Sequence, residues 1–442
     1  MLQLKNILIR DQNKNKIFNA YIYLGFIGIF FSIGENIKNI NFYEDFYAIN
    51  NLAALRSIIP FILLPINVIL FLIIGKIKNI NIIFNFFIFF IFIQFISLLI
   101  NGFDLFLMQF LVGPLSLISL ILLTKKNEDP EIIKNLILIT FIIIIFILVI
   151  FIYQNPNLSY GGGNISIFDK NIIFINSNGL SRYLVLLYAL LLAFFISTKF
   201  NYTKFFFISL LIGILVFKYE GRVNIGTFCI LSLFIYFKNK KFIKNSLILI
   251  ILFFLSAYIS TSWETINKKN ETNLISILSF DFKSSPTNRY SADGNNYFTK
   301  QDLGEGITES MDNFLTGRGE KWKLLLSHKQ NFNNIILGNG PEFDRYLLTE
   351  SNKIDKKTTG TDSANSLIYV YLSGGLISLI MFVSLGINQL YKIFKIVKKK
   401  EFIHDKILVL SILCFVLIGI RAVFENSLSV WSIDLILFLL FG

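Results

Sequence analysis

Long apolar runs, repeated along the whole chain, limit what this sequence can fold into more than any other feature. Of the 442 residues, 54% are hydrophobic and only 16% are charged. Many runs exceed about 18 residues, the length at which an apolar helix spans a bilayer. A soluble domain carries about 25% charged residues, so this chain has too few to cover a water-exposed surface. The sequence predicts a multi-span helical membrane protein and excludes a soluble enzyme.

Twelve runs are predicted as transmembrane helices. They cover residues 17–34, 57–75, 79–100, 104–124, 135–153, 181–198, 203–218, 223–237, 244–260, 366–390, 407–423 and 428–441. We therefore predict an all-α polytopic membrane protein of about twelve spans. Residues 1–260 hold spans one to nine, residues 261–365 form a large loop domain, and residues 366–442 hold spans ten to twelve.

Basic residues indicate the orientation of these spans. Lys and Arg gather in the short segments on one side, from residues 5–16 at the start to residues 392–406 before the eleventh span. Because Lys and Arg are enriched in cytoplasmic loops, both termini are predicted to be cytoplasmic. The net charge of +13 is interpreted as a topology signal, so nucleic acid is not an expected partner.

Two longer segments fall on the opposite, outer face. Residues 154–180 contain a predicted turn at Gly161, Gly162 and Gly163. Residues 261–365 separate the ninth and tenth spans and carry nearly balanced charge, with 13 basic and 14 acidic residues. Loops longer than about 15 residues are usually functional or disordered. We predict that this one folds against the membrane surface.

Arginine is scarce, with eight residues against 33 lysines. Six arginines fall on the predicted outer face or at its membrane boundary, where the positive-inside rule disfavours them: Arg182, Arg222, Arg289, Arg318, Arg345 and Arg421. A guanidinium is a planar, permanently charged fork that grips phosphate in two places. One interpretation is ion pairing with loop acids. For the group we favour an anionic ligand at the outer membrane surface.

Arg222 lies in a gap of five residues, Lys218-Tyr219-Glu220-Gly221-Arg222, between two apolar runs. This spacing predicts a tight hairpin with Arg222 at the start of a helix, near membrane depth. An isolated Arg costs about 2.5–3.5 kcal/mol at the bilayer centre and less near the interface. A phosphate would offset that cost, and a helix N-terminus also favours an anion. Glu220 is the alternative partner.

Three short motifs follow in the outer segments. Arg318 lies in Gly317-Arg318-Gly319-Glu320-Lys321-Trp322, and a turn follows at Gly338-Asn339-Gly340-Pro341. Asp362-Ser363-Ala364-Asn365-Ser366 then leads into a span with Gly374 and Gly375. No motif is specific alone. Together, over roughly residues 150–390, they resemble the O-antigen ligase/polymerase superfamily.

The resemblance implies a multi-pass enzyme of the bacterial inner membrane whose active site faces the periplasm. That family handles glycans linked to undecaprenyl pyrophosphate. Arg222 resembles its first functional arginine and Arg318 its second. Asn178, in Asn176-Ser177-Asn178-Gly179, resembles the Asn-containing motif that precedes a span.

One position departs from the family pattern. Ligases carry a His just before the Asn, but Ala364 precedes Asn365 here and cannot accept a proton. The departure favours the polymerase branch, which is a metal-independent glycosyltransferase. It moves a growing glycan from undecaprenyl pyrophosphate to a sugar hydroxyl of the next lipid-linked repeat unit. No cofactor or metal is expected, because the donor arrives activated.

The predicted site combines the resemblance with the charged residues of the outer face. Arg222, Arg318 and Asn365 are the predicted catalytic residues, with the two arginines neutralising the departing pyrophosphate. The predicted substrate-binding residues are Arg289, Arg345, Asn178, Arg182 and Trp322. A base for the acceptor hydroxyl is sought among Asp362, Glu320 and Asp344.

Three alternatives stay open. A ligase would transfer glycan to lipid A core, a transporter would carry a small anion, and a non-catalytic subunit would serve polysaccharide export. Asp434 is the main acid inside the predicted spans, and this scarcity argues against an ion-coupled carrier. Expected partners are the lipid-linked oligosaccharide, membrane lipid, a chain-length regulator and a flippase. Cys229 and Cys414 lie inside apolar runs and are predicted to be packing residues.

Overall fold

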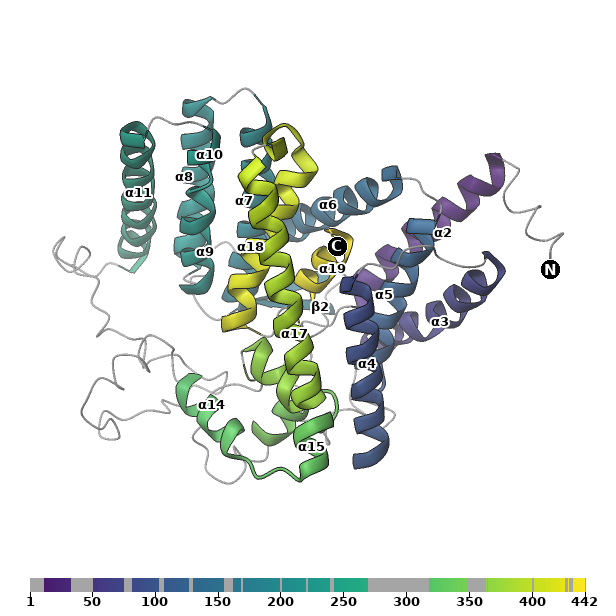
Figure 1. Cartoon of the computed structure of the whole chain (residues 1–442). Helices are drawn as coiled ribbons and strands as arrows, with labels where there is room; N and C mark the ends of the chain where they lie inside the picture. Colours follow the sequence, from purple (N-terminus) through teal and green to yellow (C-terminus); the bar gives the residue numbers. More distant parts are fainter. Residues whose placement is uncertain are drawn as a thin grey trace.

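The computed structural model is predominantly helical (Figure 1). It describes residues 12–32, 51–74, 82–102, 107–126, 130–154, 162–167, 170–198, 201–219, 222–238, 242–268, 318–348, 363, 365–399, 401–425, 428 and 432–441. The helices on the apolar runs are α2 (Gln12–Ser32), α3 (Asn51–Ile74), α4 (Ile82–Asn101), α5 (Gln109–Lys126), α6 (Pro130–Gln154), α7 (Ser177–Ser197), α8 (Tyr202–Lys218), α9 (Arg222–Ser232), α10 (Ile235–Lys238), α11 (Phe242–Lys268), α17 (Ser366–Lys399), α18 (Lys406–Phe424) and α19 (Ile433–Phe441).

Helix lies over each of the twelve predicted runs in the described ranges. Six helices there are long and apolar enough to cross a membrane by length and composition, namely Ile82–Asn101, Glu131–Gln154, Gly179–Ser197, Ile243–Ser260, Ser366–Lys398 and Lys406–Phe424. The chain is thus a multi-pass membrane protein. Twelve crossings and a separate domain over residues 261–365 stay predictions. Helix α11 continues to Lys268, two turns beyond the predicted end of the ninth span.

One element departs from the all-α prediction. Strands β1 (Gly162–Ile167) and β2 (Lys170–Asn176) form an antiparallel hairpin between α6 and α7. The predicted glycine turn is wrong for Gly162 and Gly163, which pair with Asn176 and Ile175. Repeated isoleucines in both strands favour extended backbone, and strand pairing accommodates the two glycines because it uses only main-chain atoms.

The helices form one bundle around α17 and α18 (Figure 1). Helices α7, α8, α9 and α11 stand on one side of this pair, and α2, α3, α4 and α5 stand on the other. The most extensive helix packing joins α8 to α11 and α3 to α5, followed equally by α7 to α18 and α15 to α17. Burial of apolar side chains along these contacts builds one continuous core.

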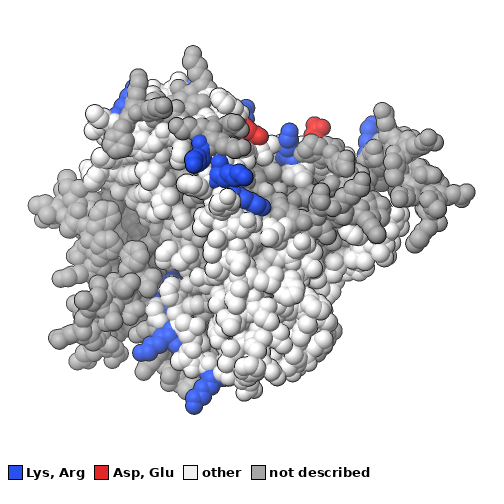
Figure 2. All heavy atoms as spheres, viewed as in Figure 1, with Lys and Arg blue, Asp and Glu red and all other residues white. Residues whose placement is uncertain are grey.

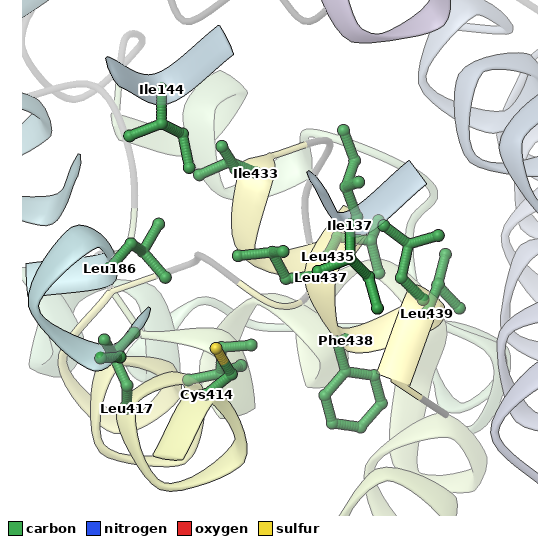
Figure 3. Close-up of a cluster of buried hydrophobic side chains, with 14 of the residues drawn as sticks. Ile137, Ile144, Leu186, Cys414, Leu417, Ile433, Leu435, Leu437, Phe438 and Leu439 are labelled. Carbon is green, nitrogen blue, oxygen red and sulfur yellow. The ribbon is translucent and has the colours of Figure 1, made fainter. Parts of the chain in front are cut away.

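Helix α19 lies inside this core rather than at its surface. Every residue from Ile433 to Leu440 is buried, and the helix packs with α18 and α6 (Figure 3). Its nine residues span about 14 Å, less than the roughly 30 Å of a hydrocarbon core. Cys414 is fully buried beside it, as expected for a packing residue.

One face of the bundle carries its charged residues mainly toward the two ends. On the face shown in Figure 2, basic residues gather along the upper end, and a broad uncharged belt separates them from a few basic residues below. The last turns of α17 reach the upper end and expose Lys392, Lys395 and Lys398. An uncharged belt of this kind is the expected lipid-facing surface of a membrane protein.

Segment 318–348 packs at the opposite end, where α17 begins (Figure 1). It contains α14 (Arg318–Ser327), α15 (Phe332–Leu337) and a short helix over residues 343–348. Leu325 and Leu348 of this segment form a second small core with Ile368 and Leu372 of α17. The first turns of α17 therefore belong to two cores, since Tyr369 and Val370 pack in the main one.

Helix α17 is broken at Gly375, where φ is 67° and ψ is −169°. Residues 366–375 are buried or half-buried, whereas Leu376, Ile380 and Ile387 beyond the break are exposed. The turn at Gly338-Asn339-Gly340 packs against the break and forms hydrogen bonds to it. The N–H of Asn339 donates to Leu372 O at 2.8 Å, and the N–H of Gly340 donates to Ser373 O at 3.1 Å. Backbone carbonyls beside the break thus gain donors from outside their own helix.

The glycines at this contact allow the two backbones to touch. A Cβ on Gly375 would collide with the carbonyl oxygen of Ile336, and one on Gly338 would collide with the main chain of Ser373 and Gly374. Gly338 and Gly375 also have positive φ, which side chains other than glycine rarely adopt. Two motifs separated in the sequence are therefore one contact in the fold.

Gly375→Ala should lower the stability of the protein markedly. The substitution forces a strained backbone, which costs about 1–3 kcal/mol, and adds the collision with Ile336. Gly386→Ala in the same helix is the control, because its Cβ meets nothing within 4 Å. Thermal unfolding in detergent should show a lower Tm for the first variant and an equal or higher Tm for the second. Equal Tm values for the two variants would contradict this account.

Candidate functional site

Asn365 begins the group of predicted site residues at the N-terminus of α17. Its Oδ1 accepts hydrogen bonds from the N–H groups of Leu367 at 2.8 Å and Ile368 at 3.2 Å. The residue is 94% buried, with 6% of its surface exposed. Asn365 is therefore the N-cap that starts the helix, the position at which Asn side chains are strongly favoured.

The chain just before Asn365 is clamped from both sides. Asp344 accepts a hydrogen bond from the N–H of Ser363 at 2.8 Å, and Nε1 of Trp322 donates to Ser363 O at 2.8 Å. Asp344 and Ser363 are both buried. Asp344, predicted as a possible base, and Trp322, predicted as a substrate-binding residue, therefore both hold the main chain at Ser363, just before Asn365.

A buried ion-pair network lies beside this clamp. Arg421 in the last turn of α18 donates to Oε2 of Glu425 at 2.5 Å, and Arg182 of α7 donates to the same oxygen at 3.0 Å. Nε of Arg421 lies 3.3 Å from Oδ2 of Asp434 in the first turn of α19. Arg421 and Asp434 have no exposed surface. Two guanidiniums and two carboxylates balance in charge, which a buried group of ions requires.

Helix dipoles support the two buried members of this network. A cation is stabilised near a helix C-terminus and an anion near a helix N-terminus. Arg421 and Asp434 occupy those two positions on consecutive helices. Arg182 and Arg421 thus follow the ion-pair interpretation of the outer arginines, while ligand contact by Arg182 stays a prediction.

Three helices begin close together around this network. Nδ2 of Asn224, in the first turn of α9, donates to Oγ of Ser181 in α7 at 2.7 Å. Oγ of Ser366, the first residue of α17, donates to Glu425 O at 2.9 Å. The N-terminal turns of α7, α9 and α17 are therefore linked through side chains. Helix N-termini present N–H groups and positive potential, so their convergence favours an anion.

Arg222 and Arg318 each begin a helix at this end of the bundle. Arg222 is the first residue of α9, two residues before Asn224, as the hairpin spacing predicted. Tyr219 follows the last residue of α8 at the same hairpin, and burial raises the pKa of its phenol above the ordinary value. Arg318 is the first residue of α14, and Trp322 one turn later ties that helix to Ser363.

Arg345 is paired within segment 318–348. Its Nε lies 2.7 Å from Oε2 of Glu342, whose side chain is 1% exposed. Glu342 has a φ of 61°, an uncommon backbone conformation for a residue other than glycine. It follows Gly340 and Pro341, so the turn that closes the α17 break continues directly into this ion pair.

Several predicted site residues lie outside the described part of the chain. Arg289 and Asp362 lie entirely outside it, and for Arg222, Asn178 and Glu320 the structure describes the backbone but not the side chain. Among the described residues, no group of three or more His, Cys, Asp or Glu side chains could hold a metal ion.

Sequence reasoning missed the partners that hold the site together. Glu425 and Asn224 carried no motif, and Arg421 and Asp434 were noted separately. Opposite charges in two successive apolar runs were a usable signal, because intramembrane ions usually pair with one another. The chain matches no protein-family model, no curated protein and no solved structure.

The ion-pair network should show strong coupling between Arg421 and Asp434. Arg421→Met or Asp434→Leu leaves an unbalanced buried charge, and breaking a buried pair costs about 3–5 kcal/mol. The double variant leaves Arg182 and Glu425 as a balanced pair. Its drop in Tm in detergent should therefore be clearly smaller than the sum of the two single drops. Additive losses would show that the two residues do not act as a pair.

The Ser363 clamp should depend on an acceptor at position 344 rather than on its charge. Asp344→Asn keeps an oxygen that can accept from the Ser363 N–H, so its Tm should stay near that of the wild type. Asp344→Leu leaves a buried N–H without this acceptor and should cost about 1–3 kcal/mol of stability. Thermal unfolding of the two variants side by side checks this, and equal losses in both would disprove the clamp.

Proposed function

We propose that the protein polymerises O-antigen or a related surface polysaccharide. In this proposal it transfers a growing glycan from undecaprenyl pyrophosphate to a sugar hydroxyl of the next lipid-linked repeat unit. The proposal includes an inner-membrane location, cytoplasmic termini, about twelve spans and an active site that faces the periplasm. A chain-length regulator and a flippase are its proposed protein partners.

One observation carries the proposal. The separate motifs that resemble the O-antigen ligase/polymerase superfamily meet at one end of the bundle, along the first ten residues of α17. Trp322 and Asp344 reach Ser363, and the Gly338–Gly340 turn reaches the Gly375 break. Helices α7 and α9, which carry Arg182 and Arg222, are joined there by the Asn224 to Ser181 hydrogen bond. This supports a common site at a membrane surface rather than unrelated local matches.

The proposed reaction needs positive charge more than any other chemistry. A bond forms between the acceptor hydroxyl oxygen and the anomeric carbon of the donor, and the bond from that carbon to the pyrophosphate oxygen breaks. The electron pair of the broken bond leaves with the pyrophosphate. Fixed guanidiniums and helix N-termini stabilise this developing charge, and each well-placed donor contributes about 100-fold or more in rate. Arg222 and Arg318 are the proposed donors.

The acceptor hydroxyl loses a proton in the same reaction. Asp344 is poorly suited to take that proton, because it is buried and holds the Ser363 N–H. Asp362 and Glu320 are the other proposed bases. Asp344→Asn separates the two roles, since a clamp survives this substitution and a general base does not.

Replacing Arg222 or Arg318 by Ala should abolish long glycan chains. The variants are expressed in a strain that lacks the protein, and glycans are profiled on gels. The lipid core should then carry one repeat unit. Without the guanidinium, the negative charge on the departing pyrophosphate is not stabilised, and transfer slows about 100-fold or more. Lys323→Ala is the matched control, because it removes an exposed cation from the same helix as Arg318 and should leave chain length unchanged.

The alternative functions give different gel patterns. A ligase defect leaves the core without any repeat unit and accumulates lipid-linked polymer, a pattern that Ala364 makes unexpected. Normal chains in the double variant Arg222→Ala, Arg318→Ala would favour a non-catalytic subunit. Unchanged glycans after deletion, with loss of uptake of a small anion, would replace the enzyme proposal by transport.

A further inference from the structure

Helix α15 exposes apolar side chains at the end of the bundle where α17 begins. Phe332 is 73% exposed and Ile335 is 36% exposed, and their spacing of three residues puts them on one face of the helix. The six residues Phe332–Leu337 include no charged side chain. Phe332 and Ile335 thus form an apolar edge on α15, and such an edge marks an interaction surface where neighbouring elements extend it.

The neighbours of α15 expose apolar residues at the same level. Oγ of Ser97 in α4 donates to Leu337 O at 2.9 Å and also to Gly338 O, which joins the end of α15 to the last turn of α4. On its other side the main chain at Ile336 touches Gly375 of α17. The residues that follow these contacts are exposed and apolar: Leu99 (54%), Ile100 (54%), Leu376 (45%) and Ile377 (37%).

Distances along the two neighbouring helices give the depth of this contact. At 1.5 Å per residue, Gly375 lies about 26 Å from Lys392 and about 30 Å from Lys395 along α17. Leu99 lies about 26 Å from Ile82, the first residue of α4, by the same rise. A hydrocarbon core is about 30 Å thick. The exposed lysines of α17 mark one boundary of the hydrocarbon core. Because Gly375 lies about one core thickness away from them, α15, which contacts Gly375, lies at the other boundary.

We propose that α15 lies at the boundary of the hydrocarbon core and that its Phe332–Ile335 edge contacts the acyl chains of membrane lipids. The edge continues the lipid-facing surfaces of α4 and α17, and this continuity favours lipid over a protein partner.

The backbone of the Gly338–Gly340 turn, next to α15, is compatible with a position at the membrane boundary. Irregular backbone at membrane depth is stable only where it is buried in protein with its polar groups paired. Gly338 and Gly340 are buried, and the N–H groups of Asn339 and Gly340 donate to α17. Asn339 Nδ2 adds a hydrogen bond to Leu372 O at 3.2 Å. The N–H groups of Asn339 and Gly340 are therefore paired within the protein, as a position beside lipid requires.

Nitroxide labels at single cysteines test the proposal. Phe332→Cys and Ile335→Cys are labelled in the full chain, in which Cys229 and Cys414 are replaced by Ala, and reconstituted in phospholipid nanodiscs. Ile380→Cys, exposed in mid-helix on α17, is the lipid-facing control, and Lys329→Cys is the water-facing control. Collision rates with oxygen, which partitions into lipid, are compared with those of a water-soluble nickel chelate.

The ratio of oxygen to nickel collisions at positions 332 and 335 should be several-fold higher than at position 329 and approach that at position 380. A ratio equal to that at position 329 would put the edge in water and overturn the proposal. Low collision rates with both reagents would overturn it too, because protein would then cover the edge. Using two label positions keeps the test decisive if one variant fails to fold.

Discussion

Satisfying backbone polar groups where water is absent is the constraint on which this structure depends. Helix α17 breaks at Gly375, and each interrupted carbonyl must find a donor from elsewhere in the fold. The Gly338–Gly340 turn provides these donors, and Ser97 of α4 caps the turn from behind. A turn that ends more than twenty-five residues before α17 begins is thereby fastened to that helix. Trp322 and Asp344, which hold Ser363 just before Asn365, lie on either side of this turn in the sequence.

The buried charges of the neighbouring ion-pair network must likewise be paired within the protein. Arg421 and Asp434 have no exposed surface, and each is held near the helix end whose dipole suits its charge. Glu425 then joins two arginines from α7 and α18. The packing of three helices against one another therefore depends on charges that are expensive to bury singly. This explains two of the arginines that the positive-inside rule disfavours.

Helix positions were readable from the sequence, whereas most contacts of the site were not. The hydrophobicity of a run is averaged over about twenty residues, so single residues that disfavour a helix change it little. Each predicted run therefore contains helix, even where prolines occur, as at Pro60 and Pro65 in α3. The glycines at 338 and 375 were noted as separate motifs, but their contact follows from tertiary packing that no local pattern encodes. The same holds for Glu425, which is an ordinary acid until α7 and α18 bring two guanidiniums to it. The β-hairpin was missed because its glycines suggested a turn and its isoleucines were not weighed.

The sharing of the first turns of α17 between two cores has a consequence for biogenesis. A ribosome makes segment 318–348 before α17, yet Leu325 and Leu348 pack on Ile368 and Leu372, which emerge later. The segment must therefore wait, with apolar side chains uncovered, until the apolar run that forms α17 has been made and inserted. Maturation of this end of the molecule is then timed by membrane insertion of a single helix.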